Sequence, residues 1–337
     1  MKSYLLDRNQ SVSVDGIRGG CFFVNIGVGQ GTILGPTLFK IYIMDLHLYT
    51  KLFCVKFADD SSFEGSSRTR DELEILMNTE LEKIATWFKN NRLTLHPNKS
   101  RFLIHSRDKL INLRLNGMPI MRCGYGLQEE SVKLLGLHMD ENLDWKIHIK
   151  NVVKKISKGS YLLWRHKAKL DITTKKTLYE SFIRCHLLYC VAVWGGATPS
   201  NLKPLLKSVK KAVRHIGPFK QHTLNRLQNL NILRFEDELA IAESKIVWKW
   251  EKNKIPSSLK NLIVEKRGTF RRRKFVTSRN SLANSIERRL SKRAEVSISN
   301  LTKFGSKNSL SKTLKSNIIQ NDYSFVCTRP GCFVCTR

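Results

Sequence analysis

Two adjacent aspartates are the first residues of this sequence that could do chemistry. Asp59 and Asp60 follow the apolar run LFCVKFA and precede two serines. Neighbouring carboxylates repel each other, so a chain places them in a solvated turn or uses them to hold a divalent cation. Mg²⁺ takes hard oxygen ligands, often one or two carboxylates together with phosphate groups. The pair alone leaves both interpretations open.

Three cysteines near the end of the sequence form a second candidate site. Cys327, Cys332 and Cys335 include one Cys-x-x-Cys pair. A structural zinc site takes four ligands, and this pattern offers three thiols with no histidine nearby. Exposed free cysteines are therefore favoured over a zinc site whose fourth ligand comes from elsewhere.

The charge of the chain indicates the kind of partner. Its 337 residues include 59 Lys and Arg against 28 Asp and Glu, a formal net charge of +31. Such a chain repels itself unless an anionic partner lies beside it, and a phosphate backbone is the usual one. A basic protein on a membrane surface is the competing class.

Sequence features argue against the membrane alternative. No secretory signal is visible, and no apolar stretch is long enough to span a bilayer. Five further cysteines are scattered, mostly within apolar runs, as in proteins of a reducing compartment. We therefore expect an intracellular protein without a membrane partner, in the nucleus, the cytoplasm or both.

Periodicity predicts a mixed first part that positions the aspartates. Strands are expected over 51–58 and 61–66, with the Asp pair as the turn between them. The run CFFVNIGV predicts a buried strand, Pro36 the first turn of a helix of about three turns, and Asn116-Gly117 a hairpin turn. An apolar stripe with acidic residues in its first turn predicts a helix over 70–91.

Helical periodicity dominates the second part. Helices are predicted over 146–165, 173–193, 200–216 and 236–253, the second capped by Thr173-Thr174. The expected core anchors of this part are Trp164, Trp194, Trp248 and Trp250. The fold class is therefore α+β.

Three domains are expected: a mixed α/β part over 1–144, a helical part over 145–255 and a basic, poorly ordered tail over 256–337. Between Lys260 and Arg337 there are 18 Lys and Arg but four acidic residues. Such a composition forms a core poorly.

The succession of these elements resembles the reverse transcriptases of non-LTR retrotransposons, the jockey-like long interspersed elements. Five motifs agree in order over residues 1 to about 250: IGVGQGTILGPTLFKIYIMDL, FADD at 57–60, WFKNNRLTLHPNKSRFL, VKLLGLHMDENLDWKIHI and LLYCVAVWGGAT. The resemblance implies a partial polymerase palm over 1–144, with an antiparallel sheet and helices, and a helical thumb and extension over 145–255.

The resemblance also implies a catalytic group. Asp59 matches the ligand of Mg²⁺ (or Mn²⁺), with Asp60 as an accessory carboxylate. Two such metals stabilise the attacking 3′ oxygen and the leaving pyrophosphate in nucleotidyl transfer. Lys99 matches the residue proposed to protonate the pyrophosphate or bind its charge, with a surface turn lysine as the alternative.

Binding residues follow from the resemblance in the same way. Gln30 and Gly31 match residues beside the template–primer or the incoming base, as do Phe57 and Ala58 of the FADD motif. An ordinary loop before a helix is the alternative for the first two. The primer grip is expected at Leu135, Gly136 and Leu137, where the alternative is a plain buried strand.

Two departures from the pattern limit this assignment. The family has proline before the Gln-Gly pair, where this chain has Gly29. Its first catalytic aspartate stands in an upstream Phe-x-Asp strand, whereas Asp7 and Asp15 here are loop residues in other motifs. We therefore expect an N-terminally truncated fragment that is inactive alone.

The expected function is an RNA-directed DNA polymerase fragment that copies element RNA from a DNA primer with deoxynucleotides. A non-catalytic nucleic-acid-binding remnant and a maturase-like RNA-binding protein are the alternatives. Whether the chain is an enzyme therefore stays open at this point, and the sequence gives no indication of its oligomeric state.

Overall fold

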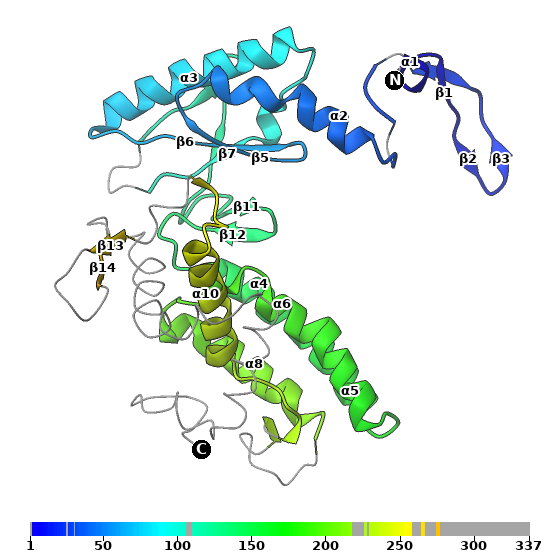
Figure 1. Ribbon diagram of the computed structural model, residues 1–337, viewed down its shortest axis with the longest axis vertical. Helices are drawn as coiled ribbons and strands as arrows, with labels where there is room; N and C mark the ends of the chain where they lie inside the picture. Colours follow the sequence, from blue (N-terminus) through cyan, green and yellow to red (C-terminus); the bar gives the residue numbers. More distant parts are fainter. Residues whose placement is uncertain are drawn as a thin grey trace. The chain divides into compact units, whose positions relative to one another are not determined.

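The structure is a computed structural model that describes residues 2–24, 26–29, 31–105, 110–217, 226–227, 229–257, 264–266 and 274–276. Helices and small two-stranded sheets make up this part of the chain, which confirms the α+β class (Figure 1). The chain divides into two compact units, Met1–Arg122 and Cys123–Arg337. The predicted boundaries at 144 and 255 separate functional regions and stay predictions.

The first unit alternates short strands with helices. Its elements are α1 (Lys2–Leu5), β1 (Arg8–Gln10), β2 (Ser13–Val14), β3 (Ile17–Arg18), β4 (Phe22–Val24), α2 (Gly35–Tyr42), the 3₁₀ helix η1 (Met44–Leu48), β5 (Phe53–Phe57), β6 (Asp60–Glu64), α3 (Arg70–Asn90), the 3₁₀ helix η2 (Pro97–Lys99), β7 (Arg101–Phe102), β8 (Arg114–Leu115), β9 (Met118–Pro119) and β10 (Met121–Arg122). The strands pair β1–β4, β2–β3, β5–β6 and β8–β9 antiparallel, and β7–β10 parallel.

Helix α3 organises the core of this unit. The Thr69 side chain caps it by accepting a hydrogen bond from the Glu72 amide, and two acidic residues occupy the first turn. Its apolar stripe packs in one cluster with Leu52 before β5 and with Cys54 and Phe63 of the β5–β6 hairpin. The helix predicted over 70–91 is confirmed.

Two local predictions for the first unit were wrong. Pro36 does lie in the first turn of a helix, but α2 spans only Gly35–Tyr42 rather than about three turns, and the chain continues as the 3₁₀ helix η1. Phe22 and Phe23 of β4 are largely exposed rather than buried. Neither strand of the small β1–β4 sheet joins the core cluster, so the apolar character of this run does not lead to burial.

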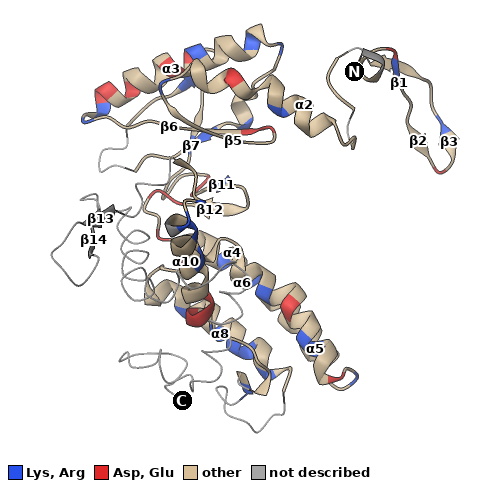
Figure 2. Cartoon of the chain, viewed as in Figure 1, with Lys and Arg blue, Asp and Glu red and all other residues tan. Residues whose placement is uncertain are grey.

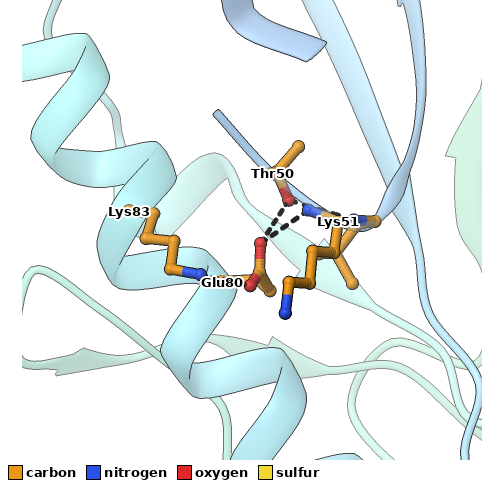
Figure 3. Close-up of polar contacts among 5 residues, drawn as sticks. Thr50, Lys51, Glu80 and Lys83 are labelled. Carbon is orange, nitrogen blue, oxygen red and sulfur yellow. Dashed lines mark hydrogen bonds and ion pairs between the residues drawn. The ribbon is translucent and has the colours of Figure 1, made fainter. Parts of the chain in front are cut away.

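A buried carboxylate ties α3 to the start of β5 (Figure 3). One oxygen of Glu80 accepts hydrogen bonds from Thr50 Oγ1 at 3.0 Å and from the Lys51 amide at 2.7 Å. The other accepts from Lys83 Nζ at 2.7 Å, while the Glu80 side chain is only 2% exposed. Residues 50 and 51 are thereby fixed directly before the strand.

The hydrogen bonds that Glu80 accepts decide whether its carboxyl group is ionised. Burial alone raises the pKa of Glu80, but the bonds from Lys83, the Lys51 amide and Thr50 outweigh burial and lower the pKa below its usual value. Stability from this carboxylate is therefore present above the pKa of an unfolded glutamate. It is lost as the pH falls through the lowered pKa.

The Glu80→Gln substitution should destabilise the first unit by about 2 kcal/mol, because an amide leaves one buried donor without a proper acceptor. Hydrogen exchange of the β5–β6 amides measures this loss, since it reports on the unit by itself. Glu82→Gln, an exposed change on the same helix, is the control and should alter stability by less than about 0.5 kcal/mol. Equal exchange in the two variants would contradict the role of Glu80.

The second unit is mainly helical. Its elements are β11 (Val132–Leu134), β12 (Leu137–Met139), α4 (Lys146–Arg165), α5 (Ile172–Tyr179), the π-helical segment η3 (Glu180–Arg184), α6 (Cys185–Leu188), α7 (Val191–Trp194), α8 (Pro199–Arg214), α10 (Phe235–Glu251), β13 (Val264–Lys266) and β14 (Lys274–Val276). Among the described helices none is long and apolar enough to cross a membrane.

The predicted helices agree with the structure except over 173–193. That stretch divides into α5, η3, α6 and α7, and Cys190 lies between the last two with a left-handed φ of 49°. Its cap is Asp171 rather than Thr173-Thr174, because Asp171 Oδ2 accepts hydrogen bonds from the Thr173 and Thr174 amides. Periodicity continues across these breaks, so the sequence predicted one helix.

The tryptophan prediction was correct in part. Trp194 and Trp248 are buried, but Trp164 is 49% exposed and Trp250 is partly exposed. Helix α4 buries the stripe that contains Ile149, Val152, Ile156 and Leu163. Trp164 follows Leu163 directly and is rotated by about 100° from it, which places its ring outside that stripe.

Candidate metal and nucleic-acid site

The aspartate pair lies at the closed end of the β5–β6 hairpin. Phe57 pairs with Asp60, so the two-residue loop is Ala58-Asp59 and Asp60 begins β6. The turn therefore lies one residue earlier than predicted. Both carboxylates belong to exposed residues, and their position depends on five cross-strand pairs.

A strained residue precedes the carboxylates. Ala58 has a φ of 52°, in the left-handed region that costs a residue with a Cβ about 1–2 kcal/mol. Two-residue hairpin loops of the type II′ kind have a positive φ at this first position, because it matches the twist of the strands. The paired strands thus hold Ala58 in a conformation that an isolated segment would leave.

The hairpin has an inner and an outer face. Cys54 and Phe63 are cross-strand partners that pack on the core, whereas Phe53, Val55 and Phe57 of β5 are exposed. Cross-strand partners project from the same face, so Phe57 and Asp60 share the outer one. An apolar row along β5 therefore leads to a carboxylate at the hairpin end.

The donor set fits a metal ion that also binds phosphate. In the described ranges no group of three or more His, Cys, Asp and Glu side chains could hold a metal ion. Asp59 and Asp60 offer hard carboxylate oxygens, which is what Mg²⁺ takes from a protein when substrate phosphates and water complete its shell. A site made from protein ligands alone does not fit these residues.

The structure describes only some of the other predicted site residues. Lys99 is exposed at the end of η2, where its amide donates to the His96 carbonyl at 3.0 Å. Gly31 has a φ of 77°, a conformation that favours glycine, but Gln30 lies outside the described residues. The cysteines predicted as zinc ligands also lie outside them: Cys327, Cys332 and Cys335.

The predicted primer-grip residues form a tight turn. Leu135 and Gly136 connect β11 to β12 with φ values of 47° and 87°, and Leu137 begins β12. Positive φ at both positions is the type I′ geometry that suits a two-residue hairpin. The segment SVKLLGLHMD is therefore a hairpin rather than one strand.

Tyr189 holds this turn from the helical part of the same unit. Its hydroxyl donates a hydrogen bond to the Leu135 carbonyl, and its ring lies 3.5 Å from where a Cβ on Gly136 would stand. Trp194 Nε1 donates to the Tyr189 carbonyl at 2.8 Å, which anchors the tyrosine in turn. Sequence reasoning missed Tyr189, and the motif LLYCVAVWGGAT was the one signal near it.

A buried histidine supports the same hairpin. The amide of His138 in β12 donates to His148 Nδ1 at 3.3 Å, so this nitrogen accepts and the ring is neutral. Burial, followed by the charges of His138 and Lys155, lowers the pKa of His148 to about 4. His148 Nε2 is buried, with no hydrogen-bond partner among the described residues.

Comparison with known proteins defines a class for the segment that contains the Asp hairpin. Residues 1–139 match the family model described as "Reverse transcriptase (RNA-dependent DNA polymerase)". This match includes the β5–β6 hairpin, the Lys99 turn and the β11–β12 hairpin. The segment is thus similar to reverse transcriptase domains.

The curated proteins that resemble this chain are RNA-directed DNA polymerases of mobile elements. The chain is 25% identical over 255 residues to "RNA-directed DNA polymerase from mobile element jockey" of Drosophila melanogaster, which covers 71% of this chain and 27% of that protein. It is 26% identical over 254 residues to "Probable RNA-directed DNA polymerase from transposon BS" of the same species. That alignment covers 71% of this chain and 28% of the relative. The predicted resemblance to jockey-like reverse transcriptases is confirmed, and the chain spans about a quarter of the length of these relatives.

Tyr189→Phe should loosen the β11–β12 hairpin by about 1 kcal/mol, because the Leu135 carbonyl loses its hydroxyl donor. Hydrogen exchange of the β11 and β12 amides should be several-fold faster in this variant. Tyr125→Phe, a change at an exposed tyrosine of the same unit, should leave these amides unchanged. Unaltered exchange in both variants would show that Tyr189 does not hold the turn.

The second unit should lose about 2–3 kcal/mol of stability as the pH falls from about 6.5 to 4. Unfolded His148 takes up a proton in this window, whereas the folded ring, with its pKa lowered to about 4, stays mostly neutral until the pH nears 4. Chemical denaturation at a series of pH values measures this loss. His148→Gln should flatten the profile, while His166→Gln at an exposed position should not. A profile that His148→Gln leaves unchanged would contradict the prediction.

Proposed function

We propose that this chain forms part of an RNA-directed DNA polymerase that copies the RNA of a non-LTR retrotransposon into DNA. The observation that carries the proposal is the position of Asp59 and Asp60, at the closed end of a hairpin within residues 1–139, the segment that matches reverse transcriptases. The partners would be an RNA template, a DNA primer and deoxynucleotides.

In this proposal Asp59 holds the divalent cation and Asp60 is the accessory carboxylate. Bound Mg²⁺ or Mn²⁺ would neutralise charge on the attacking 3′ oxygen and on the leaving pyrophosphate. The exposed carboxylates at the hairpin loop are open to a nucleotide, and the β5–β6 ladder keeps them in place. Lys99 would bind the pyrophosphate charge or donate a proton to it.

The remaining roles follow the same resemblance. Gln30 and Gly31, with Phe57 and Ala58, would lie against the template–primer or the incoming base. Leu135, Gly136 and Leu137 would contact the primer, held by Tyr189. Residues 1–144 would serve as palm and 145–255 as thumb and extension.

We propose that the 337 residues by themselves polymerise poorly. They supply one of the two aspartate motifs that the resemblance implies, and a two-metal reaction needs carboxylates from both. Binding of nucleic acid without chemistry is the second candidate function for the isolated chain. Its support is the formal net charge of +31.

A chimera tests the proposal, with residues 1–139 in place of the matching segment of the jockey polymerase. RNA-templated incorporation of deoxynucleotides should fall at least about 10²-fold with Asp59→Asn, because a carboxylate that holds the catalytic metal is lost. Glu64→Gln is the matched control, since it removes an exposed carboxylate from the opposite end of the same hairpin.

The expected control result is incorporation within about threefold of the unsubstituted chimera. Equal activity of the Asp59→Asn and Glu64→Gln chimeras would contradict a metal role for Asp59. The isolated chain should show salt-dependent RNA binding and little incorporation.

A further inference from the structure

The outward face of α4 combines cations with aromatic rings. Lys150, Lys154 and Lys158 stand four residues apart, about 6 Å of helix rise from one to the next. Tyr161 and Trp164 continue this face toward the C-terminal end of the helix. We call these five residues the α4 ridge.

The two rings of the ridge do not belong to the core. Tyr161 is 50% exposed and Trp164 is 49% exposed, while the buried stripe of α4 lies on the opposite side of the helix. Their ring centroids are 5.8 Å apart at an interplanar angle of 35°. Arg165 Nη1 donates to Tyr161 Oη at 3.1 Å and steadies that ring. Exposed aromatic faces with fixed neighbours are suited to stacking with a ligand.

The charges of α4 favour an anionic partner. The helix contains six Lys and Arg residues and no Asp or Glu (Figure 2). Within the described part of the chain, no ion pair engages Lys150, Lys154 or Lys158. Like charges four residues apart destabilise a helix, and a row of phosphates would reverse that effect.

We propose that the α4 ridge binds single-stranded nucleic acid, with the lysines along its phosphates and unpaired bases stacked on Tyr161 and Trp164. A duplex keeps its bases stacked internally, so it offers the phosphates but not the free base faces. The inference rests on the proposed function for the source of the strand, which would be the RNA template. It adds the surface and the mode of recognition.

Binding of fluorescein-labelled twelve-nucleotide oligouridine RNA to the full chain tests the ridge. Trp164→Ala and Tyr161→Ala should each weaken binding by about tenfold, whereas Trp164→Phe should retain most of the affinity because it keeps a ring. Tyr125→Ala, at an exposed tyrosine of the same unit, is the control and should change affinity by less than about twofold. Each Lys→Gln change in the ridge should lower the slope of log affinity against log salt by about 0.7, with the aromatic variants leaving it unchanged.

An abasic strand of the same length separates stacking from charge. The unsubstituted chain should bind it about tenfold or more weakly than oligouridine, because stacking is lost. The Tyr161→Ala/Trp164→Ala double variant should bind the two strands within about twofold of each other. Equal oligouridine binding by this variant and the unsubstituted chain, or unchanged discrimination against the abasic strand, would overturn the inference.

The tests also distinguish RNA binding at the ridge from membrane binding and from the proposed polymerase function. Loss of binding to anionic phospholipid vesicles on Trp164→Ala, with RNA binding intact, would assign the ridge to a membrane and overturn the inference. RNA affinity that is unchanged in the ridge variants would overturn the inference that the ridge binds RNA, but it would not affect the proposed function. Ridge-dependent RNA binding together with equal activity of the Asp59→Asn and Glu64→Gln chimeras would support the ridge and count against the metal role of Asp59.

Discussion

The buried carboxylate of Glu80 is the interaction on which the candidate site depends. It fixes residues 50 and 51 on α3, and β5 begins two residues later. The β5–β6 ladder then sets which residues face the core and which close the loop. A slip of one residue would exchange the two faces, burying Phe57 and exposing Cys54. The position of Asp59 thus depends on the hydrogen bonds of Glu80 at the far end of the hairpin together with the β5–β6 register.

Local signals in the sequence predicted local structure well. Helix α3 agrees with its acidic first turn and apolar stripe, and the turn at Asn116-Gly117 has the positive φ values that this pair favours. The Asp pair was placed within one residue of its position. These features depend on residues close together in the chain, which is why a pattern could predict them.

Most failures concern contacts between distant segments. Trp164 is the exception, because the spacing of the buried stripe of α4 already places the residue after Leu163 outside it. The breaks after α5 interrupt a continuous helical pattern. Glu80 and Tyr189 have residue types common on surfaces, and their roles arise from partners 30 and 54 positions away. Tertiary packing decides such cases, and one sequence does not contain a pattern for it.

The most direct test of the metal assignment is paramagnetic broadening of backbone amide signals by Mn²⁺ in the presence of a deoxynucleoside triphosphate. If Asp59 and Asp60 hold the cation, the signals of residues 58–61 broaden first, and Asp59→Asn/Asp60→Asn abolishes the effect while Glu64→Gln preserves it. Broadening that persists in the double variant, or that leaves residues 58–61 unaffected in the unsubstituted chain, would contradict the assignment.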